Sequence, residues 1–166
     1  PAAKFGAFSY NTLNEMGESL MLYTLSGAPK EAFEKFGMPR NTEVFNHTFA
    51  GLGGMRVEDI TKDPRYGKNQ PNNGMPDGHL PVVSYLSVPV ISKNGEVIGG
   101  LFFGHPDAGV FTAEHENVVA AIASQAAIAI DNAKLYEEVK ALNAKKDEFI
   151  GMASHELKTP LTSISG

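Results

Sequence analysis

One short run near the end of the sequence contains residue types that could carry out phosphoryl transfer. A histidine is followed directly by a carboxylate in the run Ser154-His155-Glu156-Leu157-Lys158-Thr159-Pro160-Leu161. A neutral imidazole can attack a phosphoryl group with one nitrogen when the ring is accessible and an acceptor holds its other nitrogen. His155 and Glu156 supply such a nucleophile and acceptor. The alternative interpretation is an ordinary surface histidine on a helix.

Several other kinds of site are excluded by what the sequence lacks. The 166 residues include no cysteine, so disulfides, thiolate metal sites and a cysteine nucleophile are ruled out for this chain. His115 and His155 each precede a glutamate as in zinc proteases, but Val119 and Thr159 stand where the second histidine belongs, so no metal is predicted. No glycine-rich nucleotide-binding loop occurs. A net charge of -5 argues against nucleic acid as a partner.

A long helix must position His155. Thr112 is a helix-cap residue followed by glutamates, which predicts a helix from Ala113 that nothing interrupts before Pro160. Within it, residues at alternating steps of four and three form a stripe: Ile128, Asn132, Leu135, Val139, Leu142, Lys146 and Phe149. This heptad stripe predicts a parallel homodimer, with Asn132 at a buried position that fixes the register. The alternative is an amphipathic helix packed only on its own domain.

Two β-hairpins are predicted before this helix. Aromatic and aliphatic runs at residues 4–10 and 18–25 flank a turn, and both runs are apolar on nearly every position. Two further runs at residues 82–92 and 96–104 surround Asn94-Gly95, the strongest short hairpin signal. We expect these last two runs to be the central strands of a sheet that is covered on both faces.

Short helices and an irregular segment separate the two hairpins. Helices are expected at residues 26–36 and 41–49, and an edge strand at residues 55–60. Residues 61–80 have no regular pattern, and a loop of that length in a compact domain is typical of a lid or binding segment. A disordered loop is the alternative.

The run around His155 resembles the phosphoacceptor box of sensor histidine kinases, the start of their HisKA-type (DHp) domain. The resemblance covers residues 149–166 and implies that His155 is the phosphoacceptor, that Glu156 assists proton removal and that Thr159 positions water for dephosphorylation of a response regulator. It also implies ATP and Mg²⁺ as cofactors of the parent kinase. These 166 residues lack the ATP-binding domain and should be inactive alone; that domain is expected within about a hundred residues after Gly166.

The upstream residues resemble GAF domains, a PAS-related family with an antiparallel sheet flanked by helices. The resemblance is carried by residues 57–66, 78–90 and 95–105. It implies an α+β fold and three regions: a GAF sensor domain at residues 1–127, a coiled-coil signalling helix at 128–148 and the phosphoacceptor segment at 149–166. The helix that precedes the first hairpin in that family is missing from residues 1–127.

In GAF domains, ligands lie between the sheet and the irregular segment after the second strand. The resemblance therefore implies a set of candidate ligand-binding residues: Tyr66, Met75, His79, Ser84, Tyr85 and Phe103. The lack of cysteine argues against covalent bilin attachment and against the methionine-sulfoxide reductase variant, and the signature of cyclic-nucleotide binders is not found. His79 could ligate haem or a metal, but a histidine satisfied by hydrogen bonds is the more common case.

The leading functional prediction is a sensory module of a two-component sensor histidine kinase. Binding of a small molecule or a partner would bias the dimeric helix and so control phosphorylation of His155 and transfer to a response-regulator receiver domain. The alternative is a ligand-free GAF domain that only dimerises and spaces the kinase. A free-standing enzyme would need a catalytic constellation in the GAF part, and none is found.

The expected location is the cytoplasm of a bacterial-type signalling system, with any membrane anchor elsewhere in the parent. The most apolar run, residues 118–130, is about 13 residues long, short of the roughly 20 that cross a bilayer, so no membrane contact is expected for these residues. No secretory signal is visible at Pro1.

Overall fold

The structure is a computed structural model that describes residues 5–13, 19–26, 42–68 and 73–165, with side chains at 42–68 and 73–155. It divides into two compact units, Pro1–Ile128 and Ala129–Gly166. The first unit contains the sheet, and the described part of the second consists of helix alone. The two units are described separately below.

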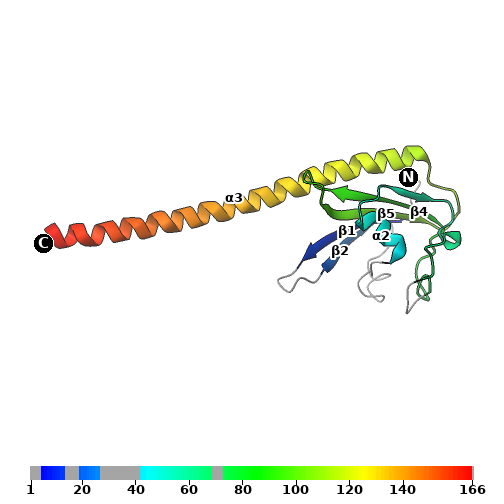
Figure 1. Cartoon of the computed structure of the whole chain (residues 1–166), viewed down its shortest axis with the longest axis horizontal. Coiled ribbons are helices and arrows are strands. Elements are labelled where there is room, and N and C mark those ends of the chain that lie inside the picture. Colours follow the sequence, from blue (N-terminus) through cyan, green and yellow to red (C-terminus); the bar gives the residue numbers. More distant parts are fainter. Residues whose placement is uncertain (1–4, 14–18, 27–41, 69–72, 166) are drawn as a thin grey trace. The chain divides into compact units, whose positions relative to one another are not determined.

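A five-stranded antiparallel sheet in the order β2-β1-β5-β4-β3 forms the first unit (Figure 1). The strands are β1 (Phe5–Leu13), β2 (Ser19–Ser26), β3 (Met55–Val57), β4 (Ser84–Ile91) and β5 (Val97–His105). Both predicted hairpins are present, and β1 pairs with β5 to join them. The predicted edge strand is β3, which ends at Val57 rather than at residue 60. The sheet together with its helices confirms the predicted α+β class.

The turn between β4 and β5 follows from the Asn-Gly pair that predicted it. Gly95 has φ +87°, a conformation that glycine adopts without a Cβ clash. The Gly95 amide donates to Ser92 O at 2.9 Å, and the Asn94 side chain accepts from the Glu96 amide at 3.1 Å. These bonds close the hairpin locally.

Three helical segments are described. Helix α2 (Glu43–Phe49) starts after Thr42, whose side chain accepts from the Phe45 amide at 3.4 Å, and a short 3₁₀ turn covers Ile60–Lys62. Helix α3 spans Ala113–Ser165. The helices expected at residues 41–49 and from Ala113 are therefore confirmed, and the one expected at residues 26–36 lies outside the described residues.

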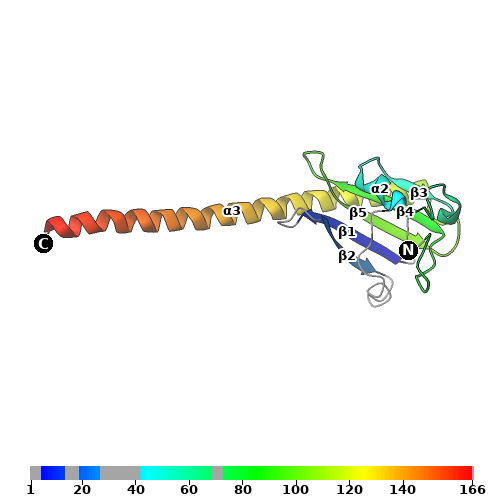
Figure 2. The same cartoon turned by 60° about the horizontal axis from the view of Figure 1, so that its bottom comes forward.

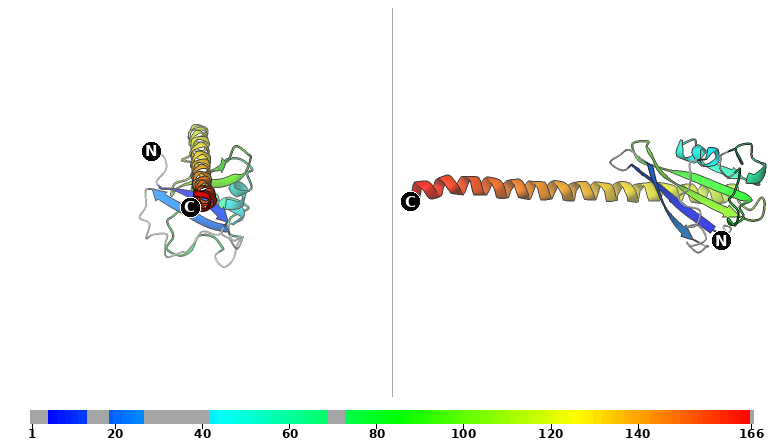
Figure 3. Two further views of the ribbon diagram at one scale, coloured as in Figure 1. Left: turned by 90° about the vertical axis from the view of Figure 1, so that its left-hand side faces the viewer. Right: turned by 90° about the horizontal axis from the view of Figure 1, so that it is seen from below.

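Within the first unit, one helical segment covers each face of the sheet. Helix α2 and the first turns of α3 lie on opposite faces (Figures 1 and 2), and Figure 3 shows the same layering from other sides. Every residue of β4 from Ser84 to Val90 is buried, as expected for a central strand covered on both faces. On the α3 side, Val119, Ala123 and Ala127 provide the buried helix face.

Helix α3 passes through Pro160 and continues to Ser165. A proline removes one amide donor, and here the backbone remains helical on both sides of it. Within Ala113–His155, an 18-residue window has a mean hydropathy of 1.3, and 17% of that window is buried. By length and composition alone, this helix is therefore long and apolar enough to cross a membrane. The expectation from the shorter run at residues 118–130 did not anticipate this window.

Substitution of Gly100 tests the packing between β5 and α2. A Cβ at Gly100 would lie 2.8 Å from Phe102 Cζ and 3.0 Å from Thr48 Cγ2. Phe102 and Thr48 are buried, so neither can move easily, and Gly100→Ala should destabilise the domain by about 1–3 kcal/mol. Urea unfolding followed by tyrosine fluorescence measures this change in the free energy of unfolding.

Gly151→Ala is the matched control for Gly100→Ala. No atom lies within 4 Å of the position of a Cβ at Gly151, which is in α3. The same substitution should therefore stabilise the helix, by about 0.5–1 kcal/mol. Equal effects of the two substitutions would contradict the packing around Gly100.

Candidate functional site

A cluster of buried side chains fills the α2 side of the sheet. We call it the Tyr85 cluster; its buried members are Val44, Met55, Ile60, Tyr85 and Phe102. Partly buried residues from α2 and the segment after β3 pack against it: Phe45, Phe49, Val57, Tyr66, Met75 and Val82. The cluster thus joins strands of the sheet to the irregular segment that the sequence marked as a possible lid.

Aromatic rings make up much of the Tyr85 cluster. Phe45 and Phe102 meet edge to face, with ring centroids 5.2 Å apart and planes at 86°. Phe49 lies 5.6 Å from Phe102, and Tyr85 lies 6.5 Å from both Phe45 and Phe102. These separations lie within the range of favourable aromatic pairs.

Three hydroxyl groups lie in this apolar region. Thr48 Oγ1 and Ser87 Oγ are 2.7 Å apart in a buried hydrogen bond that ties α2 to β4. The Tyr85 hydroxyl lies close to both, yet it forms no hydrogen bond with any described atom. Burial raises the pKa of Tyr85 above its ordinary value, so the phenol is neutral over the physiological range.

Short polar contacts hold the segment that covers the cluster. The Met75 amide donates to Tyr66 Oη at 3.2 Å, and the Ile60 amide donates to Val83 O at 2.8 Å. Arg65 donates to Asp63 through Nε and Nη2, both at 2.8 Å. Arg65 Nη1 also lies 3.4 Å from His47 Nδ1, which links the segment to α2.

The Asp63–Arg65 ion pair makes the free energy of unfolding depend on pH in the acidic range. Hydrogen bonds from Arg65, together with its charge, lower the pKa of Asp63 from 3.8 to about 2. Because the pKa is lower in the folded state, the stabilisation is complete above pH 3.8 and is lost as the pH falls through about 2. The shift corresponds to about 2 kcal/mol, since the Asp63 side chain is only 9% exposed.

Asp63→Asn should therefore lower the free energy of unfolding by up to about 2 kcal/mol at pH 6, and the difference from wild type should shrink toward pH 2. Urea unfolding across this pH range measures it. Asp107→Asn is the matched control, because the Asp107 side chain is 81% exposed. A loss with Asp63→Asn that is the same at every pH would contradict the ion-pair account.

Three of the six candidate ligand-binding residues come together in the structure. Tyr66, Met75 and Tyr85 all belong to or pack against the Tyr85 cluster. Phe103 follows Phe102 on β5, and neighbouring residues of a strand point to opposite faces, so Phe103 lies on the face away from the cluster. Phe102, the preceding residue on β5, belongs to the cluster instead.

The other two candidates, Ser84 and His79, have structural partners. Ser84 is fully buried, donates to Asp107 O and accepts from the Val110 amide at 3.0 Å, so it fastens the loop before α3. His79 Nδ1 lies 2.7 Å from Leu80 O. The hydrogen bond fits the expectation that His79 is a satisfied histidine. Neither residue belongs to the Tyr85 cluster.

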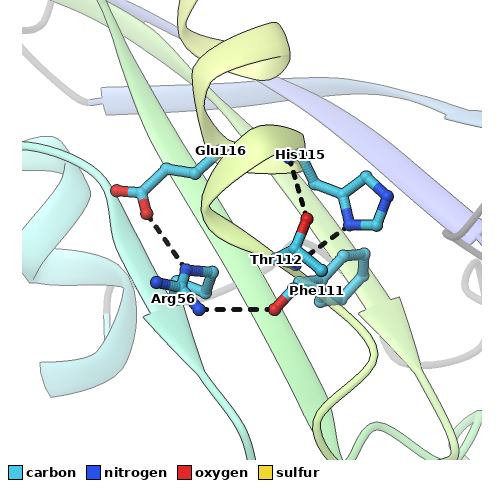
Figure 4. A network of polar contacts seen from close by, with 5 residues as sticks. All are labelled: Arg56, Phe111, Thr112, His115 and Glu116. Atoms are coloured by element: carbon cyan, nitrogen blue, oxygen red, sulfur yellow. Dashed lines mark hydrogen bonds and ion pairs between the residues drawn. The ribbon is translucent and has the colours of Figure 1, made fainter.

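The beginning of α3 has its own polar network (Figure 4). Thr112 Oγ1 accepts from the His115 amide at 3.3 Å, and His115 Nδ1 accepts from the Thr112 amide at 3.0 Å, so the two residues cap the helix reciprocally. Arg56 on β3 donates from Nε to Glu116 at 3.2 Å and from Nη1 to Phe111 O at 3.5 Å. The sequence predicted the Thr112 cap but gave no indication of Arg56.

In the second unit, the helix exposes both the heptad stripe and His155. The large apolar residues of the stripe, from Leu135 to Phe149, are between 46% and 71% exposed. His155 is exposed one turn after Gly151. The side chains of Glu156 and Thr159, to which the resemblance gave roles, lie outside the described residues.

Comparison with known proteins identifies relatives of the chain. A family model described as the GAF domain matches residues 16–131. The hybrid signal transduction histidine kinase G of Dictyostelium discoideum is 31% identical over 98 residues, which cover 50% of this chain and 3% of that protein. The chain thus spans a small fraction of the length of this curated relative.

Solved structures share the fold at low sequence identity. The GAF domain of an Acinetobacter phosphoenolpyruvate-protein phosphotransferase has a TM-score of 0.58 at 15% identity, covering 82% of this chain and 75% of that one. A type II free methionine-R-sulfoxide reductase from Thermoplasma acidophilum has 0.57 at 16% identity, covering 76% and 78%. A domain attributed to a two-component sensor histidine kinase of Sinorhizobium meliloti 1021 has 0.56 at 10% identity, covering 83% and 86%.

Proposed function

The chain belongs to the GAF domain family, and on that basis we propose that it is the sensory module of a two-component sensor histidine kinase. The observation that carries the proposal is helix α3, which begins against the sheet and remains helical through the His155 run. The similarity to a histidine kinase of Dictyostelium discoideum supports it further. A signal in the domain and a phosphoacceptor histidine would thus share one secondary-structure element.

The proposed chemistry takes place at His155. The imidazole is exposed and can approach the terminal phosphate of ATP, which the ATP-binding domain of the parent would supply together with Mg²⁺. Glu156 follows directly in the sequence and would accept the proton from the other ring nitrogen. Thr159, one helical turn after His155, would position water when a partner receiver domain is dephosphorylated.

Within the first unit, β3 provides a physical link between the Tyr85 cluster and α3. Met55 and Val57 pack in or against the cluster, and Arg56 between them holds Glu116 and Phe111 at the start of the helix. A change of packing in the cluster would therefore move the contacts that fix the first turn of α3. The exposed heptad stripe would carry that change along a homodimer.

A ligand-free spacer is the second candidate, and the close ring packing inside the Tyr85 cluster favours it. Native mass spectrometry and thermal shift against a metabolite panel distinguish the two functions. A sensor should gain thermal stability with at least one metabolite, because a ligand that binds only the folded state stabilises it. Failure of every metabolite, with regulated phosphorylation absent in the parent, would contradict the sensory function.

A further inference from the structure

We propose that the Tyr85 cluster binds a small, uncharged and mainly apolar molecule with one acceptor oxygen, which accepts a hydrogen bond from Tyr85 Oη. The inference rests on the proposed sensory function, because it gives the chemical class of the ligand for the same domain. Three observations carry it: a buried hydroxyl without a partner among the described residues, the lack of an uncompensated charge among the described residues around it, and an aromatic wall that is only partly buried.

The Tyr85 hydroxyl is the first observation. The residue is 5% exposed, and its Oη has no hydrogen-bond partner among the described residues. A buried tyrosine normally pairs its hydroxyl, and an unpaired one is costly enough to require an explanation. An acceptor atom on a ligand would restore the missing hydrogen bond.

The nearest hydroxyls do not fill that role. Thr48 and Ser87 lie beside Tyr85, but they bond to each other at 2.7 Å. Their oxygens keep lone pairs that could accept from a phenol, but neither lies in hydrogen-bond geometry with Tyr85 Oη. The phenolic proton therefore remains available to a group that enters from outside the cluster.

The charges around the cluster indicate an uncharged ligand. Every member of the Tyr85 cluster is apolar or a neutral tyrosine. Among the described residues, the charge of Arg65 acts on Tyr85. Arg65 already donates two hydrogen bonds to the Asp63 carboxylate, both at 2.8 Å, so its charge is compensated. A charged ligand would lose its hydration and find no unpaired opposite charge in the part of the cluster that the structure describes.

The partly buried aromatic residues indicate a flat ligand of about one ring. Phe45 and Tyr66 cover the cluster from α2 and from the segment after β3, and Met75 lies beside them. Because these side chains reach the surface, they can turn aside without unfolding the sheet. A ring that replaced Phe45 would keep an edge-to-face contact with Phe102.

The test uses four probes of similar size with the 166-residue chain: acetophenone, ethylbenzene, benzoate and benzylamine. At millimolar concentration, acetophenone should raise the melting temperature by about 2–5 °C, ethylbenzene by less, and the two charged probes not at all. In Tyr85→Phe, the acetophenone shift should fall to that of ethylbenzene. The ligand-free Tyr85→Phe protein should melt at the wild-type temperature or above, because an unpaired hydroxyl has been removed.

Tyr136→Phe is the matched control, because Tyr136 lies on α3 and is 68% exposed. This substitution should leave the melting-temperature shifts with all four probes unchanged. Any of three results would overturn the proposal: equal stabilisation by benzoate or benzylamine, an acetophenone shift that survives in Tyr85→Phe, or no shift with any probe. Binding of a charged probe would reject the ligand class and leave the sensory function standing. Absence of phosphate on His155 in the parent would reject the kinase role and leave this result intact.

Discussion

Replacing His155 with glutamine should abolish phosphate transfer from ATP to the full-length protein. Glutamine keeps a polar side chain and favours helix, but it has no imidazole nitrogen that can form a phosphoramidate bond. The residue lies inside helix α3 and is exposed, so the fold should not change. We expect incorporation of radiolabelled phosphate to fall roughly 1,000-fold or more, to background.

His115→Gln in the same helix is the matched control. His115 caps the start of α3 together with Thr112, and glutamine at that position can form the same reciprocal cap. Phosphate incorporation should stay near the wild-type rate. Undiminished labelling of His155→Gln, or equal losses in the two variants, would show that the imidazole of His155 is not the acceptor.

Leu142→Asp should separate the proposed homodimer. Leu142 is 64% exposed and lies in the heptad stripe between Val139 and Lys146. In a dimer, the substitution removes two leucines from the seam and leaves carboxylates facing an apolar partner surface. Burial of each leucine is worth about 1.5–3 kcal/mol, so the dissociation constant should rise by at least about 100-fold. Sedimentation equilibrium of the 166-residue chain measures it.

Ala144→Asp introduces the same charge two residues away, outside the stripe. It should leave the dissociation constant within a few-fold of wild type, because its position faces away from the seam. A wild-type chain that stays monomeric at high micromolar concentration would refute the dimer. An identical change in both variants would mean that helix propensity or net charge, rather than the seam, determines association.

The elements with strong local patterns were predictable from the sequence. Asn94-Gly95 specifies its hairpin through one positive φ angle and one side-chain bond to the Glu96 amide, all within a few residues. The Thr112 cap is likewise local. Helix α3 follows from residues 113–150, which contain neither glycine nor proline, although this run did not show that the helix would continue through Gly151 and Pro160. Local chemistry therefore gave the element types and their approximate ends.

The composition of the Tyr85 cluster was only partly predictable. Phe102 and Phe103 are adjacent and identical in type, and only the register between β4 and β5 decides that Phe102 faces α2. The hydrogen bond between Thr48 and Ser87 joins residues 39 positions apart, so no local pattern announces it. The same is true of Arg56 and Glu116, which are 60 positions apart. Such pairings depend on the tertiary fold and become visible only in the structure.

If α3 carries the phosphoacceptor histidine of a sensor kinase, the phosphorylated residue can be located directly. The full-length protein would be incubated with ATP and Mg²⁺, kept at alkaline pH to preserve phosphohistidine, and mapped by mass spectrometry. We expect phosphate on His155 of the peptide that contains residues 147–158. Phosphate at another residue, or none on a protein shown to bind ATP, would contradict it.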